Sequence, residues 1–131
     1  MPVRGVRGAT TVESNDAGAI ARGTAELLRV LVERNGIRPE DIASATFTVT
    51  DDLDAEFPAS SARTLPGWQD LALLCAREIR VPGALGRCIR VLLHWNTERS
   101  QAEVRHAFLR GARALRPSWA VRVPGDEDEP R

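Results

Sequence analysis

"CIRVLLHW", residues 88–95, predicts a strand that is buried on both faces of a sheet. It offers Cys, Ile, Val, Leu and Trp side chains, which the interior of a sheet accepts, and it carries a full charge only at Arg90. A guanidinium in that position loses much of its water, which is costly unless an anion takes the place of the water. Arg90 therefore needs an anionic partner, either a carboxylate of this chain or a bound ligand.

The whole chain has the length and composition of one globular domain. It has 131 residues, of which 43% are hydrophobic and 27% are charged. We expect a single folded domain over residues 1–123 and an acidic, disordered tail over residues 124–131. No apolar run reaches the ~20 residues of a membrane-spanning helix, and the N-terminus lacks the apolar core of a signal peptide. The expected location is therefore cytoplasmic.

The sequence lacks the common catalytic and metal-binding motifs. Its two cysteines and two histidines have no metal-ligand spacing, and it has neither a phosphate-binding glycine loop nor a nucleophile elbow. The net charge is zero, without a basic run of the kind that binds nucleic acid. Cys75 is a conceivable nucleophile, but neither histidine can be assigned as its base, so a structural thiol is favoured. We predict no metal and no cofactor.

Apolar periodicity and turn residues divide the chain into strands and helices. A helix over residues 14–35 is expected to end at Asn35–Gly36, and a second helix over residues 100–112 is expected to begin at a Ser100–Glu103 capping box. A short helix is expected to begin at Pro58. The expected strands cover residues 2–13, 43–50, 71–78, 88–95 and 113–117.

This order of elements predicts an α/β (α+β) fold, a mixed β-sheet with two main helices on one face. Two helices cannot cover both faces of such a sheet. We expect the other face to be apolar and to be covered by further copies of the chain.

Three polar residues stand in or at the end of expected strands. Arg7 lies in the first strand between Gly5 and Gly8, Glu78 ends the third strand, and Arg90 is in the fourth. Taken singly, each of these side chains is compatible with a strand end at which it reaches solvent. Arg90 and Glu78 are also compatible with a simple ion pair between them. Together they describe a pocket that suits a small dianion, since guanidinium groups bind carboxylates bidentately and a carboxylate can accept a hydroxyl proton.

Four segments resemble, in order, the monofunctional trimeric chorismate mutases of the α/β-barrel class. They are "RGVRGATT" (4–11), "FPASSAR" (57–63), "CAREIRVPGALGRCIRVLLH" (75–94) and "ALRP" (114–117). The resemblance implies a homotrimer with a pseudo-barrel core and a site at each subunit interface. It also implies the Claisen rearrangement of chorismate to prephenate in phenylalanine and tyrosine biosynthesis, a reaction that needs no nucleophile, general base, metal or cofactor.

The resemblance also implies a role for each candidate residue. Arg90 would face the ether oxygen of the breaking bond and hold a carboxylate, Arg7 would bind the other carboxylate, and Glu78 would accept the ring hydroxyl. The remaining residues implied to bind substrate or to line the pocket are Phe57, Ala59, Arg63, Leu74, Cys75, Ala76, Arg77, Phe108, Leu115 and Arg116.

The sequence departs from the family pattern at three positions, which concern substrate affinity more than the chemical step. Phe108 stands where the family commonly has a tyrosine, Ser60 where a lysine can occur, and Leu74 where a threonine can occur. Two alternatives stay open from the sequence. One is an imine deaminase of the same architecture, and the other is a non-catalytic, carboxylate-binding trimer.

Overall fold

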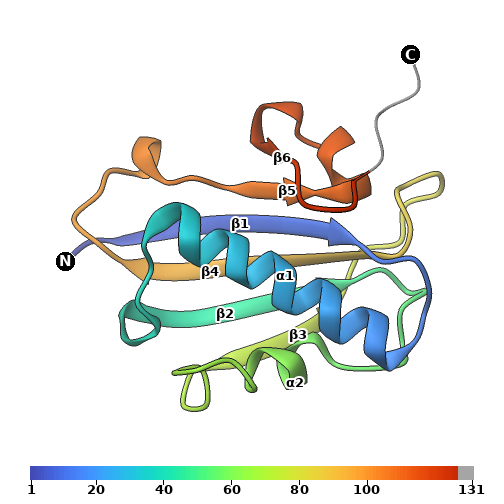
Figure 1. Ribbon diagram of the computed structural model, residues 1–131, viewed down its shortest axis with the longest axis horizontal. Helices are drawn as coiled ribbons and strands as arrows, with labels where there is room; N and C mark the ends of the chain where they lie inside the picture. Colours follow the sequence, from blue (N-terminus) through green and yellow to red (C-terminus); the bar gives the residue numbers. More distant parts are fainter. Residues whose placement is uncertain (127–131) are drawn as a thin grey trace.

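A computed structural model describes residues 1–126 as a mixed sheet with helices on one face (Figure 1). Over these residues the sheet has six strands in the order β3-β2-β4-β1-β5-β6. The strands are β1 (Val3–Thr11), β2 (Ile42–Val49), β3 (Leu73–Arg77), β4 (Cys88–Asn96), β5 (Ala107–Leu109) and β6 (Ala120–Val121). The α-helices are α1 (Ala17–Asn35) and α2 (Pro58–Ala62), and the 3₁₀ turns are η1 (Pro39–Asp41), η2 (Gln101–Glu103), η3 (Arg110–Ala114) and η4 (Pro117–Trp119).

Strand β4 lies inside the sheet, as the "CIRVLLHW" stretch predicts. It pairs antiparallel with β1 on one side and with β2 on the other. Alternate β4 side chains face α1, and Val91, Leu93 and Trp95 among them join the main hydrophobic core. The opposite side chains include Arg90 and Leu92, and Leu92 is 37% exposed. The expectation that β4 is buried on both faces is therefore correct for the α1 face and wrong for the other face within one chain.

Helix α1 forms where the sequence predicts it and packs on the centre of the sheet. The Asp16 carboxylate accepts a hydrogen bond from the Ala19 amide at 2.8 Å, which caps the first turn. Gly36 ends the helix with φ +67°, a conformation that glycine adopts without strain. Leu27 and Leu31 of α1 are fully buried against the sheet.

Gly8 on β1 allows this close packing. A Cβ atom there would lie only 2.8 Å from Leu31 Cδ1 and 2.9 Å from Leu27 Cδ1. The glycine next to Arg7 therefore serves the approach of α1 to the sheet.

The predicted second main helix, over residues 100–112, is wrong. The capping box of Ser100 and Glu103 does form, but it caps only the 3₁₀ turn η2. The chain then enters β5, whose three residues are all buried and which pairs parallel to β1. The pairing of β5 with β1 and the complete burial of its side chains stabilise this structure more than the helix favoured by the capping box would. The second α-helix is instead α2, which begins at Pro58 as expected and lies with α1 on the same face (Figure 1).

The predicted last strand, over residues 113–117, is also wrong. The chain forms η3 and η4 there, and β6 follows at Ala120–Val121. Of the expected tail, residues 124–126 are described, and Pro124 and Asp126 contact Arg110. Residues 127–131 of that tail lie outside the described residues. No helix in the described part of the chain is long and apolar enough to cross a membrane.

The face of the sheet away from α1 is not uniformly apolar, contrary to expectation. Toward β5, a small cluster of Ala9, Cys88, Phe108 and Ala112 is completely buried. Toward β3 the same face carries polar side chains, among them Thr48 of β2, at intermediate exposure. This half-open polar surface contains the candidate site.

Candidate active site

The ion pair of Arg90 and Glu78 lies at the centre of the site. Arg90 Nε is 2.8 Å from Glu78 Oε1, and the two side chains are 31% and 18% exposed. Although the atoms are close, the Nε–H bond is not directed at that oxygen, and the buried Nε has no hydrogen-bond acceptor among the described residues. Glu78 therefore neutralises part of the Arg90 charge, but the buried Nε–H group of Arg90 stays without a hydrogen-bond acceptor among the described residues.

Thr48, which is not among the residues predicted from the sequence, holds the carboxylate of this pair. Its hydroxyl donates to Glu78 Oε1 at 2.6 Å. Thr48 on β2 lies directly opposite Arg90 on β4 in the antiparallel register. The Glu78 backbone N–H donates to the Val49 carbonyl at 2.9 Å, so the backbone also fixes the position of Glu78. The same oxygen of Glu78 thus has two neighbours that restrict its movement.

Arg7 approaches the pair from β1 and is held through its backbone. The Arg7 N–H donates to His106 Nδ1 at 2.9 Å. Its guanidinium carbon lies 5.6 Å from the Phe108 ring centroid. The pKa of Arg7 is lowered from its ordinary value, first by burial and then by the nearby charges of Arg90 and Arg116. Arg7, Arg90 and Arg116, which together form the arginine cluster, are therefore close enough for their charges to repel one another.

The charge of this cluster suits a dianion. Arg7, Arg90 and Arg116 supply three positive charges and Glu78 one negative charge, so two positive charges remain for a ligand. Burial also raises the pKa of the neighbouring Cys88 thiol to about 11, even though Arg90 acts in the opposite direction. Cys88 is therefore a neutral thiol at physiological pH and is not available as a nucleophile.

His106 is a second contact that was not predicted from the sequence. Because its Nδ1 accepts the Arg7 N–H, the ring holds its proton on Nε2 when it is neutral. The pKa of His106 is lowered from its ordinary value of 6.5 by burial, then by Arg7 and Arg116. Both effects keep the imidazole in the neutral form that accepts this hydrogen bond.

The other predicted site residues divide into two groups. Phe108 and Leu115 lie with the arginine cluster, since Phe108 is next to the Arg7 guanidinium and Leu115 packs against the buried group that contains Phe108. Within one chain, the remaining residues do not join the cluster; these are Phe57, Ala59 and Arg63 around α2, and Leu74, Cys75, Ala76 and Arg77 on the edge strand β3.

The second group is largely exposed, and only Leu74 and Ala76, which pair with Thr46 and Thr48 of β2, lie on the same face of the sheet as the cluster. Ala59 is 5% exposed inside the α1-side core, while Phe57 is 66% exposed. Leu74 on β3 is 64% exposed, and β2 separates it from Arg90. The Cys75 side chain, which the resemblance implies to line the pocket, packs instead against the α1-side core. Only its backbone could take part in a site on the other face.

Three cavities in the described part of the chain do not coincide with the arginine cluster. They have volumes of about 780, 690 and 420 Å³, and neither Arg7 nor Arg90 lines any of them. The largest lies between α1 and the C-terminal segment, and only the smallest borders Glu78. The arginine cluster lies instead on the open face of the sheet, where Arg90 is 31% exposed.

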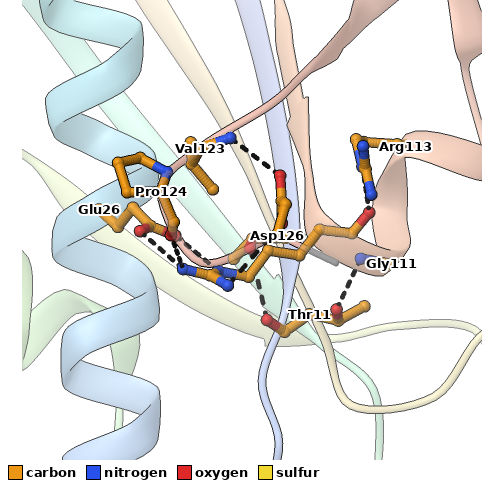
Figure 2. A network of polar contacts seen from close by, with 9 residues as sticks. Thr11, Glu26, Gly111, Arg113, Val123, Pro124 and Asp126 are labelled. Atoms are coloured by element: carbon orange, nitrogen blue, oxygen red, sulfur yellow. Dashed lines mark hydrogen bonds and ion pairs between the residues drawn. The ribbon is translucent and has the colours of Figure 1, made fainter. Parts of the chain in front are cut away.

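A separate polar network fixes the C-terminal segment that carries Leu115 and Arg116. Arg110 donates to both carboxylate oxygens of Glu26 on α1, at 2.9 and 3.0 Å. Figure 2 shows Glu26, Pro124 and Asp126 gathered around this guanidinium. The hydrogen bond with Glu26 raises the pKa of Arg110, so its charge is stable. These contacts tie the segment to α1.

The comparisons with known proteins identify the family of the chain. A family model described as chorismate mutase type I matches residues 3–119. The chain belongs to the type I chorismate mutases. It is 52% identical over 116 residues to the chorismate mutase AroH of Thermus thermophilus, an alignment that covers 88% of this chain and 94% of that protein. It is 41% identical over 121 residues to the AroH of Bacillus subtilis (strain 168), covering 92% and 95% respectively.

A solved structure agrees with the family assignment. The chorismate mutase from Clostridium thermocellum is 49% identical and superposes with a TM-score of 0.82, covering 85% of this chain and 98% of that chain. The resemblance read from the sequence is confirmed. The type I chorismate mutase reaction is the intramolecular conversion of chorismate to prephenate in aromatic amino-acid biosynthesis. The imine deaminase considered from the sequence is not supported.

Proposed function

We propose that Arg7, Glu78 and Arg90 carry out this rearrangement by electrostatic stabilisation, with no covalent intermediate. Chorismate is a dicarboxylate with a ring hydroxyl, and the cluster has two unbalanced positive charges and one carboxylate acceptor. The observation that carries the proposal is Arg90 itself. It is a half-buried cation, fixed 2.8 Å from Glu78, with a buried N–H that finds no acceptor among the described residues.

Arg90 would act mainly in the transition state. As the ether C–O bond breaks, negative charge develops on its oxygen, and a cation already in place stabilises that charge more than the neutral ether of the ground state. The ion pair with Glu78 holds the Arg90 guanidinium before substrate binds, and the Thr48 hydroxyl holds the Glu78 carboxylate. Little reorganisation is then needed at the moment of reaction.

The other residues would bind and orient the substrate. Arg7 and Arg116 would hold carboxylates, and Glu78 would accept the ring hydroxyl through the oxygen that does not face Thr48. Phe108 would pack against the substrate without offering a hydroxyl. Holding the enolpyruvyl side chain over the ring supplies a further, entropic part of the rate enhancement.

We also propose that a homotrimer completes the site and forms a pseudo-barrel core. Several large apolar side chains of the chain are exposed, which one molecule in water disfavours. They are Val3, Phe57, Leu74, Ile79, Val81 and Leu92. A neighbouring copy could bring its own Phe57, Ala59, Arg63 and Leu74–Arg77 over the open arginine cluster. The half-open face and the two separate groups of predicted residues support this arrangement.

Two measurements test these proposals together. Purified protein is mixed with chorismate, prephenate is identified as the product, and the mass is measured by sedimentation. We expect saturable conversion and a mass three times the 14.3 kDa of the chain. A folded trimer that binds dicarboxylates without turnover would support the non-catalytic alternative, and a monomer with full activity would exclude the shared site.

A subunit-mixing experiment tests the shared site more sharply. Arg90→Ala removes the central cation, and Arg63→Glu places a repelling charge in the second group. If each site combines residues of two subunits, co-expression of the two inactive variants forms some sites with both native residues, and activity returns. If each subunit has a complete site, the mixture stays as inactive as its components.

A further inference from the structure

Trp119 lies among the side chains of the arginine cluster and is not among the residues predicted from the sequence. It ends the 3₁₀ turn η4, in which its N–H donates to the Arg116 carbonyl at 2.8 Å. Its ring centroid is 4.0 Å from that of His106 and 5.6 Å from that of Phe108. The Arg116 guanidinium carbon lies 3.6 Å from the Trp119 ring centroid, and that of Arg7 lies 5.7 Å away. One indole therefore contacts both flanking cations of the site.

The contact with Trp119 holds Arg116 where no carboxylate of the described residues does. Arg116 is exposed, and no ion pair joins it to an acidic side chain among residues 1–126. The nearby Arg7 repels it, which is one cause of the lowered pKa of Arg7. An aromatic face attracts a guanidinium without neutralising its charge. The stacked position on Trp119 thus keeps Arg116 beside the site while its full charge stays available for an anion.

We propose that Trp119 is a positioning residue for substrate binding. It holds the Arg116 guanidinium, and in part that of Arg7, in the geometry that receives a substrate carboxylate. This inference rests on the proposed function of the cluster. Phe108 has no hydroxyl that could donate a hydrogen bond to a substrate carboxylate, as a tyrosine at this position would. Trp119 would supply part of the missing orientation of the substrate by holding the arginines that bind its carboxylates. The carboxylates are bound equally strongly in the ground state and in the transition state. Loss of Trp119 should therefore raise KM more than it lowers kcat.

The test compares the steady-state kinetics of the wild type with those of Trp119→Leu and Trp119→Phe. A lost cation–π contact predicts a KM about 10-fold higher in Trp119→Leu, with kcat within about 2-fold. Trp119→Phe keeps an aromatic face and should keep KM within about 3-fold of the wild type. Arg99→Leu is the matched control, because Arg99 lies 5.6 Å above the Trp95 ring in a similar contact outside the cluster. Its KM should not change.

A double-mutant cycle separates positioning from simple packing. If Trp119 acts through Arg116, then Trp119→Leu added to Arg116→Ala raises KM by less than about 2-fold beyond the single Arg116→Ala change. Three outcomes would overturn the inference and leave the mutase activity established. The KM increases of the two single variants could multiply fully in the double variant, KM could be unchanged in Trp119→Leu, or the loss in Trp119→Leu could be confined to kcat. A wild type that does not convert chorismate would overturn the proposed function, and this inference with it.

Discussion

Replacing Thr48 by valine tests whether the Arg90–Glu78 pair is preorganised by its neighbour. The substitution keeps the side-chain shape and removes the hydroxyl that donates to Glu78 Oε1 at 2.6 Å. A hydrogen bond to a charged group contributes about 1.5–3 kcal/mol. Since the Glu78 side chain is 18% exposed, water can replace part of that bond, and the lower end of the range applies. A loss of about 1.5 kcal/mol corresponds to roughly a 10-fold lower kcat/KM.

The assay follows the initial rate of chorismate loss over a range of concentrations, with thermal unfolding measured in parallel. Thr46→Val is the matched control, because Thr46 lies two residues earlier on the same strand and face. It should keep wild-type kinetics. In a Glu78→Gln background, Thr48→Val should have a much smaller effect. Wild-type kcat/KM in Thr48→Val, or an equal loss in Thr46→Val, would refute the reasoning.

Two further predictions concern pH and packing. Because the pKa of His106 is lowered in the folded state, its neutral form contributes stability that is fully present above pH 6.5 and is lost as the pH falls below that value. His106→Gln should flatten this part of the pH dependence of unfolding free energy, measured in denaturant, and an unchanged profile would contradict the assignment. Gly8→Ala should destabilise the protein by about 1–3 kcal/mol, seen as a lower Tm, because the added Cβ would meet Leu27 and Leu31 at 2.9 and 2.8 Å. Gly5→Ala, whose Cβ would have only an ordinary contact at 3.6 Å, should leave the Tm nearly unchanged, and equal effects of the two would argue against close packing by α1.

Local patterns were sufficient to predict the central strand and the long helix. The apolar run at residues 88–95 favours a strand with neighbours on both sides, and β4 has them. Asp16 and Gly36 mark the ends of α1 through caps that depend only on nearby residues. These elements can be predicted from the sequence because residues close together in the chain determine them.

The C-terminal elements could not be predicted in the same way. The capping box at Ser100 forms, yet a cap specifies where a turn begins and not how far a helix continues. The segment after it gains more by pairing with β1 and by burying Ala107–Leu109 completely. That gain depends on a strand about one hundred residues earlier, which no local signal near Ser100 contains.

The same limit applies to the candidate site. Arg7, Glu78 and Arg90 could be selected because they are charged residues at strand positions and match the family segments. Thr48 and His106 reach them through partners 30 and 99 residues away in the chain. An alternating strand shows that Thr48 shares a face with other β2 residues, but the register between strands decides that it meets Glu78.

The most direct test of the central claim is the kcat of Arg90→Ala for chorismate conversion. Arg80→Ala is its matched control, because Arg80 carries the same charge on a side chain that is 85% exposed and lies 3.5 Å from Asp51. Loss of one preorganised donor at a developing charge typically lowers the rate about 10²–10³-fold. We predict a loss of this size for Arg90→Ala, with wild-type turnover in Arg80→Ala and an unchanged sedimentation mass for both. Near-normal turnover by a folded Arg90→Ala protein would contradict the account.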